Sequence, residues 1–196
     1  VFTPILAEIS KIVGIDYETS AEQTAFRVIA DHVRMLTFSI ADGGLPSNDG
    51  RGYVMRRILR RAARYGRKLN MSEPFIYKIV PKLVELMGDA YPEIVSRASH
   101  VQSVIRAEED HFNRTLDRGL EIFDKIKAEL QGNKEIIIPG SDVFKLYDTY
   151  GFPVDLTRIL PEENGLTLDM GGFEQEMEAQ RERARAASKF HAKPGL

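Results

Sequence analysis

The sequence predicts an all-α fold, a multihelical array with one long bridging helix and at most a minor two-stranded β element. Apolar residues recur every three or four positions through most of the 196 residues, which is the spacing of one helix face. Between Tyr91 and Leu130 this spacing continues with Gly119 as the one strong breaker. Runs typical of strands are short and occur at 135–138 and 166–168.

Two helices and a glycine-rich loop are expected first. Residues 1–13 carry one apolar stripe, and Gly14 supplies the stop. A second helix is expected from about Ser20, as its N-cap, to Ala41. The loop that follows, 42–52 (DGGLPSNDGRG), holds four Gly and one Pro, which interrupt regular structure.

Three further helices are expected before Gly132. One covers about 53–69, and another covers about 73–87, capped by Ser72 and kinked at Pro81. The third is a single rod from Tyr91 to Leu130, far longer than three or four turns. An acidic interruption of its apolar seam favours a bridge between subdomains over a coiled coil.

Shorter elements are expected after Gly132. They are a strand at 135–138, a helix from Ser141 to about Tyr150, a helix from Pro153 to about Glu163, a strand at 166–168, a charged helix over about 172–188 and a loose tail from Lys189. We therefore expect four parts: a first helical subdomain (1–90), the bridging helix (91–132), a second small helical subdomain (133–190) and a tail (191–196).

The composition describes a globular chain and excludes several classes of protein. Its 27 basic and 29 acidic residues leave a net charge of -2, so a polyanionic partner must be argued from local clustering. It contains no cysteine, which excludes disulfides and thiolate chemistry and agrees with a reducing, cytoplasmic location. No apolar run approaches the roughly 20 residues of a membrane span. The chain starts with Val1 rather than methionine, so we expect it to belong to a longer protein.

The third expected helix carries the strongest local signal, a concentration of basic residues with no acid among them. Phosphate backbones attract such a stripe, because each cation replaces a condensed counterion. Arginine predominates, which favours forked contacts to phosphates or base edges. The helix is expected to present Arg57, Arg60, Arg61, Arg64 and Lys68 together, opposite an apolar side that includes Val54 and Leu59. The full basic set is Arg51, Arg56, Arg57, Arg60, Arg61, Arg64, Arg67 and Lys68.

Two alternatives stay open for this helix. Its cations can pair with acids of the long helix, such as Glu108, Glu109 and Asp110, which makes the stripe a solvated structural face. It can also dock an acidic protein surface, in which case the chain is a helical protein-interaction module with a basic docking helix.

Two other positions carry side chains that can read a base. Asn48 stands in the loop before the basic helix and offers both a donor and an acceptor; the alternative is that Asn48 or Asp49 caps the helix. Asp148 lies in the aromatic segment LYDTYGFPVDL (146–156) and can accept from an amino or imino group; the alternative is a structural Asp at a helix end.

The sequence shows no active site. The four histidines, at positions 32, 100, 111 and 191, lack metal-ligand spacing. No phosphate-binding loop, nucleophile elbow or dinucleotide fingerprint is present. A self-contained hydrolase or transferase is therefore not expected.

Several segments resemble the alanyl-tRNA synthetase family. The most specific are RVIADHVRMLTFSIADGGLPSNDGRGYVMRRILRRAARYG (27–66) and LYDTYGFPVDLT (146–157), and EEDHFNRTLDRGL (108–120) and RERARAASKF (181–190) agree with them. The resemblance covers essentially the whole chain. It implies the middle, tRNA-recognition domain of such an enzyme, which selects tRNA(Ala) so that a separate class II catalytic domain can attach alanine using ATP.

The resemblance also implies roles for individual residues. The family reads a G·U wobble pair in the acceptor stem with an Asn before the basic helix, which matches Asn48, and an Asp in the LYDTYGFP segment, which matches Asp148. Because the long helix separates these two residues in sequence, it is the expected spacer that lets them face one stem. The tRNA backbone would then be bound by Arg51, Arg56, Arg57, Arg60, Arg61, Arg64 and Lys68.

No catalytic residue, metal or cofactor is implied within these residues. ATP and magnesium would belong to the catalytic domain of the parent chain, and zinc to its editing domain. The implied partners are the acceptor stem of tRNA(Ala) and those two domains, with neither DNA nor a membrane among them.

Overall fold

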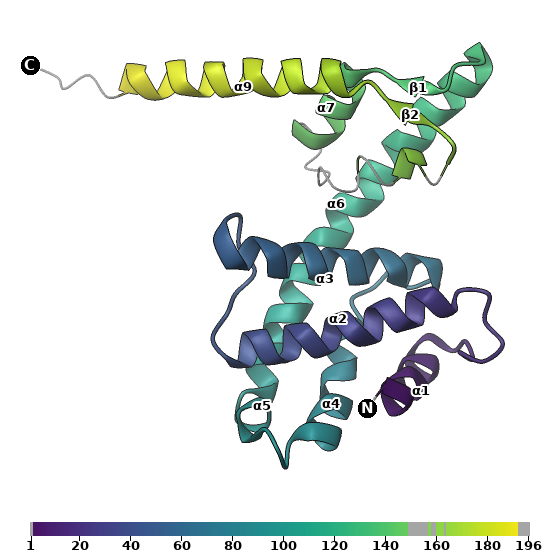
Figure 1. Cartoon of the computed structure of the whole chain (residues 1–196), viewed down its shortest axis with the longest axis vertical. Coiled ribbons are helices and arrows are strands. Elements are labelled where there is room, and N and C mark those ends of the chain that lie inside the picture. Colours follow the sequence, from purple (N-terminus) through teal and green to yellow (C-terminus); the bar gives the residue numbers. More distant parts are fainter. Residues whose placement is uncertain (1, 149–156, 158–159, 163, 192–196) are drawn as a thin grey trace, which may run out of the picture. The chain divides into compact units, whose positions relative to one another are not determined.

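The computed structural model describes residues 2–148, 157, 160–162 and 164–191, with side chains described as far as Arg183 (Figure 1). The predicted all-α class is confirmed: helices dominate, one of them is long, and the described strands form one two-stranded parallel sheet. The chain divides into two compact units, Val1–Arg114 and Thr115–Leu196. The predicted boundaries near 90 and 132 stay a prediction.

The first unit is built around helix α2. Its elements are α1 (Phe2–Val13), α2 (Gln23–Ala41), α3 (Gly50–Lys68), the 3₁₀ helix η1 (Ile76–Ile79), α4 (Val80–Met87), α5 (Pro92–Ser96) and the first part of α6 (Ala98–Asn133). Helices α2 and α3 run side by side, and α1 and α4 also pack on α2 (Figure 1). The core contains fully buried side chains from several elements, among them Phe26, Leu59, Phe75 and Phe112.

The first two helices agree with the sequence except at one cap. Gly14 ends α1 with a φ of +73°, a left-handed conformation that glycine adopts without strain. Ser20 was predicted to cap α2, and this is wrong. Its hydroxyl accepts a hydrogen bond from the Glu22 N–H (3.0 Å) in a turn before the helix, which begins at Gln23.

The segment from Ser72 to Met87 differs from the single kinked helix predicted there. It forms the 3₁₀ helix η1 followed by α4, and Pro81 lies in the first turn of α4, where its missing N–H costs no helical hydrogen bond. Ser72 caps neither element; its carbonyl accepts from the Asn113 side chain (3.3 Å). Long-range hydrogen bonds of this kind cannot be read from local spacing.

The predicted long helix is present but is interrupted once. The chain forms α5, turns at Arg97, and continues as the 36-residue α6. Where α5 ends, the Glu93 carbonyl accepts from both the Ser96 hydroxyl (3.1 Å) and the Arg97 N–H (3.2 Å). The apolar period survives the interruption, because Ile94 and Val101 are both fully buried.

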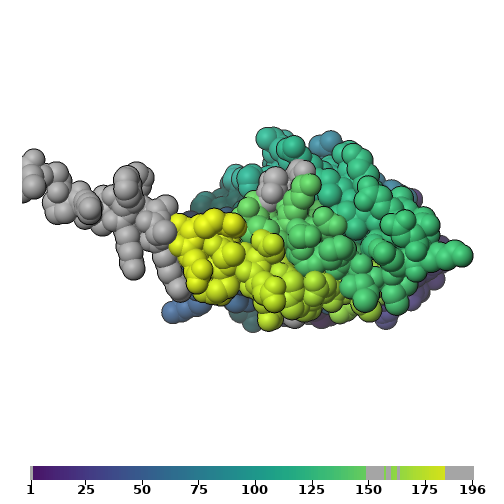
Figure 2. Space-filling model, turned by 90° about the horizontal axis from the view of Figure 1, so that it is seen from above, coloured from purple at the N-terminus to yellow at the C-terminus, as the bar shows by residue number. Residues whose placement is uncertain are grey.

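The described part of the second unit includes the remainder of α6, a small sheet and the helices α7 and α9. Strands β1 (Ile137–Ile138) and β2 (Thr167–Leu168) pair in parallel, with Ile137 opposite Thr167. Helix α7 (Gly140–Asp148) packs on α9 (Met170–His191). In Figure 2 the yellow surface of α9 lies directly beside the green surface of the preceding elements.

Asp169 joins the starts of α7 and α9. Its carboxylate accepts from the Gly172 N–H (2.9 Å) as the N-cap of α9, and from the Gly140 N–H (3.4 Å) at the start of α7. A Cβ at Gly140 would clash with the Gly172 backbone, so this close approach requires glycine. The predicted Ser141 cap is therefore wrong, since α7 begins one residue earlier.

Some predictions fall outside the described residues. These are most of the helix expected from Pro153, the aromatic residues Tyr150 and Phe152, and the tail after His191. The loose tail predicted from Lys189 is wrong as far as His191, because α9 continues through that residue.

Candidate nucleic-acid interface

Seven of the eight basic residues of α3 form two sets that face different surroundings, and the eighth, Arg67, is half-buried. One set, Arg56, Arg60 and Arg64, turns toward the protein, and the other, Arg51, Arg57, Arg61 and Lys68, is exposed. The prediction that Arg57, Arg60, Arg61, Arg64 and Lys68 project together is therefore wrong for Arg60 and Arg64. Val54, which was predicted on the buried side, is 54% exposed.

Two members of the inward set, Arg56 and Arg60, contact helix α6. Arg56 Nε lies 2.9 Å from Glu108 Oε1, and its Nη2 donates to Glu108 Oε2 (3.2 Å). Arg60 Nε lies 3.5 Å from Glu108 Oε1, and its guanidinium lies 5.3 Å from the centre of the Phe112 ring. Arg64 is 8% exposed. Arg56 and Arg60 connect α3 to α6, as the ion-pair alternative predicted for Glu108.

The other two acids named in that alternative have partners outside α3, although the charge of Arg67 on α3 also acts on Glu109. Asp110 pairs with Arg114 on its own helix (2.6 Å). Glu109 is fully buried, and its carboxylate accepts from the backbone N–H groups of Phe75 (3.0 Å) and Ile76 (3.1 Å). It thereby satisfies the free donors at the start of η1.

The outward set alternates with tyrosines. The guanidinium of Arg57 lies 5.9 Å from the centre of the Tyr53 ring, and Tyr53 is 42% exposed. Arg61 and Lys68 lie 5.9 Å and 5.6 Å from the centre of the Tyr65 ring. We call the residues Tyr53, Arg57, Arg61, Tyr65 and Lys68 the outward face of α3. Cations and aromatic rings together suit a nucleic acid, because the cations contact phosphates and the rings contact riboses or bases.

The loop before α3 folds back on the first turn of that helix. Asp49 occupies the N-cap position but makes no side-chain capping bond. The Ser47 hydroxyl donates to the Asp49 carbonyl (2.8 Å). A Cβ at Gly52 would clash with the Ser47 hydroxyl and the Leu45 carbonyl oxygen, so glycine is required for the loop to lie this close.

Asn48 is exposed, and its side-chain amide oxygen accepts a hydrogen bond within the protein. Arg56 Nη1 donates a hydrogen bond to Asn48 Oδ1. In the part of the chain that the structure describes, Asn48 Nδ2 has no hydrogen-bond partner. The loop therefore presents an N–H₂ group beside the start of the outward face of α3.

Asp148 is anchored in a similar way in the second unit. It is the last residue of α7 and is exposed, and Gln180 Nε2 on α9 donates to its Oδ1 (2.5 Å). One residue earlier, the Tyr147 ring meets the Phe173 ring edge to face at 6.3 Å between centroids. This contact and the Gly140–Gly172 approach fix α7 on α9 at both ends. Asn48 belongs to the first unit and Asp148 to the second, and their predicted convergence on one stem stays a prediction.

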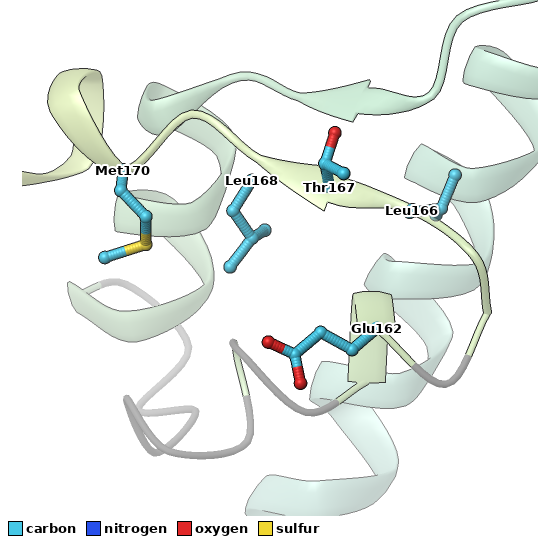
Figure 3. A pocket seen from close by; sticks show the side chains of 5 residues that line it. All are labelled: Glu162, Leu166, Thr167, Leu168 and Met170. Atoms are coloured by element: carbon cyan, nitrogen blue, oxygen red, sulfur yellow. The ribbon is translucent and has the colours of Figure 1, made fainter.

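The second unit also contains a pocket of about 280 Å³ beside β2 (Figure 3). Its described lining is mostly aliphatic, with the Glu162 carboxylate as the charged group, and comprises Glu162, Leu166, Thr167, Leu168 and Met170. A single exposed carboxylate provides no acid–base pair, so we assign this pocket no reaction. Among the described residues no cluster of three or more His, Asp or Glu has a metal-site arrangement, and no helix is both long and apolar enough to cross a membrane.

The model of the family described as tRNA synthetases class II (A) matches residues 1–194. The chain therefore belongs to this family, and the resemblance inferred from the motifs is confirmed. It is 51% identical over 187 residues to the alanine–tRNA ligase of Halalkalibacterium halodurans, 50% identical to that of Listeria monocytogenes and 48% identical to that of Streptococcus pneumoniae. Each match covers 95% of this chain and 21% of the relative, so the chain spans about a fifth of the length of these curated relatives.

Several residues of this surface were not predicted from the sequence. Tyr53 and Tyr65 lie among the arginines at helical spacing, so their interleaving with the cations was available as a signal. Glu108 was predicted only in the ion-pair alternative. The Phe75–Glu109 and Gln180–Asp148 hydrogen bonds join residues more than thirty positions apart in sequence, and no local pattern marks them.

Proposed function

We propose that this chain is the tRNA-recognition part of an alanine–tRNA ligase, a class II aminoacyl-tRNA synthetase. In this proposal it binds the acceptor stem of tRNA(Ala) and selects it by a G·U wobble pair, while a separate catalytic domain of the longer protein attaches alanine using ATP. The observation that carries the proposal is the outward face of α3, which stands directly beside Asn48 in a chain of this family.

In this proposal, different residues bind the phosphate backbone and recognise the wobble pair. The outward cations contact the phosphate backbone and bind stems of any sequence. The wobble pair exposes a guanine amino group, and Asp148 is suited to it because a carboxylate only accepts hydrogen bonds. Asn48 provides the second reading contact. Selection by both residues requires the two units to contact one stem at the same time.

We place the cofactors of such an enzyme outside these residues. ATP and magnesium would be bound by the catalytic domain, and zinc by the editing domain. For zinc, this placement is supported by a sequence with no cysteine and four dispersed histidines. The proposed partners are the acceptor stem and those two domains, and the proposed location is the cytoplasm.

The proposal is tested by binding this chain to two acceptor-stem hairpins that differ only in G·U against G·C, over a series of salt concentrations. We expect tighter binding of the G·U hairpin by about 5- to 150-fold, the range of a good base contact. Asn48→Ala and Asp148→Ala should each lose that preference while keeping the salt dependence.

The other outcomes are equally informative. Equal, salt-sensitive binding of both hairpins would limit the chain to backbone contacts and overturn selection by these residues. Absence of binding to either hairpin would favour the protein-interaction module, in which the basic helix docks an acidic protein surface.

A second prediction separates the two sets of arginines. Arg61→Ala and Lys68→Ala should weaken binding of both hairpins alike and lower the salt slope by about one each, without a change in melting temperature. Arg60→Ala should instead lower the melting temperature, because it removes the contacts with Glu108 and Phe112.

Arg106→Ala is the matched control for that experiment. Arg106 is also an exposed arginine over a tyrosine, 5.3 Å from the centre of the Tyr77 ring, but it lies on α6. Its replacement should leave RNA binding unchanged. If Arg106→Ala weakens RNA binding as much as Arg61→Ala does, the proposal that the outward face of α3 binds the RNA backbone is wrong.

A further inference from the structure

We infer that Arg56 and Glu108 are positioning residues for Asn48, which fix its side chain so that the amide N–H₂ group is what meets the RNA. The inference rests on the proposed function and deepens it, because it names the chemistry of the contact. It assigns Asn48 a hydrogen-bond acceptor on the nucleic acid as its partner, and it gives two residues that touch no RNA a role in selectivity.

The orientation of the Asn48 amide follows from the chemistry of its neighbour. An arginine side chain has donors and no acceptor, so the Asn48 atom that meets Arg56 Nη1 must be the amide oxygen. The amide group is planar, and holding its oxygen also directs its nitrogen. Asn48 is therefore a donor toward any partner on its exposed side.

Arg56 can fix this orientation because Glu108 fixes Arg56. Arg56 Nη2 donates a hydrogen bond to Glu108 Oε2 (3.2 Å), and Arg56 Nε lies 2.9 Å from Oε1 as an ion pair without hydrogen-bond geometry. This charge-assisted hydrogen bond and the ion pair together hold the guanidinium in place. The third nitrogen, Nη1, is left for Asn48.

The Arg56–Glu108 ion pair is largely buried, which strengthens it. The side chains of Glu108 and Arg56 are 11% and 20% exposed, so water screens the ion pair less than it screens an exposed pair. Glu108 lies on α6 and Arg56 on α3, so the contact is built on two helices rather than on the loop. The loop supplies Asn48, and the helices set its direction.

The sharpest test of the contact is Asn48→Asp. Aspartate has the same shape and retains the contact with Arg56, but it has no donor for the RNA. We expect the preference for the G·U hairpin to fall to that of Asn48→Ala. Asn70→Asp makes the same chemical change at the other end of α3, and there we expect both hairpins to bind slightly more weakly with an unchanged ratio.

The test of positioning is Arg56→Lys, which keeps the charge but cannot reach both partners with a fixed fork. We expect the G·U to G·C ratio to fall about fivefold or more, with little change in the salt slope. Arg57→Lys is the control on the neighbouring, outward residue, and it should keep the ratio. A merely structural role for Arg56 would lower the melting temperature and leave the ratio unchanged.

The outcomes separate this inference from the proposed function. Equal binding of both hairpins by the unsubstituted chain overturns selection by this chain, and the inference with it. A preference that is present in the unsubstituted chain and kept by both Asn48→Asp and Arg56→Lys overturns the inference alone.

Discussion

The stability of the first unit is expected to fall as the pH rises from about 4.5 to about 7, because Glu109 is buried. Burial raises the pKa of the Glu109 carboxyl from 4.5 to about 7, against the opposing effects of the Phe75 and Ile76 N–H groups and of the Lys78 and Arg67 charges. The side chain is fully buried on α6 and accepts hydrogen bonds from both of these backbone groups.

The sign follows from proton binding. Between pH 4.5 and 7 the folded chain holds the Glu109 proton and the unfolded chain has released it, so unfolding releases a proton and becomes more favourable as the pH rises. The shift from 4.5 to about 7 corresponds to a change of about 3 kcal/mol in the free energy of unfolding. The contribution is present in full below the unfolded pKa and is lost above the folded one.

Urea unfolding at several pH values, compared between the original chain and Glu109→Gln, measures this contribution. Glutamine has nearly the same size and keeps one oxygen acceptor for the Phe75 and Ile76 N–H groups, but it does not titrate. The difference in unfolding free energy between the two proteins should therefore change by about 3 kcal/mol across this range, while effects of other carboxylates cancel. A difference that does not vary with pH would contradict the prediction.

Phe112→Ala is expected to lower the free energy of unfolding of the first unit by about 3 to 5 kcal/mol. The ring is fully buried on α6, and its removal leaves a cavity in addition to the lost burial of apolar surface. It also removes the ring that Arg60 of α3 packs over. Because Glu108 lies one turn earlier on the same helix, the ion pair between Glu108 and Arg56 should also weaken.

Amide hydrogen exchange in α2 measures the loss within the first unit alone. Phe2→Ala is the matched control, since Phe2 is 41% exposed and its replacement should cost less than about 1 kcal/mol. The G·U preference should fall in Phe112→Ala under conditions where the protein remains folded, and it should be retained in Phe2→Ala. Similar protection in the two variants would show that α6 does not support α3 in this way.

Local sequence pattern predicts which segments of this chain are helical, but it predicts the helix boundaries less accurately. The apolar spacing predicted α1, α2, α3 and α6, because a helix face repeats within a few residues and needs no distant information. The errors occur where a distant group supplies the missing hydrogen bond. The η1 helix exists because Glu109 of α6 satisfies its first N–H groups, and the carbonyl of Ser72 is taken by Asn113.

The candidate site shows the same division. By itself, the sequence determined that α3 is basic, that Asn48 precedes it and that the motifs belong to a tRNA synthetase family, since composition, order and motifs are local properties. Only the tertiary structure decided which arginines face outward, because Glu108, the partner of Arg56, is 52 residues away in the chain. A helix period places a cation on a face, but the acid or ring packed against that face determines whether the cation binds the protein or remains accessible to RNA.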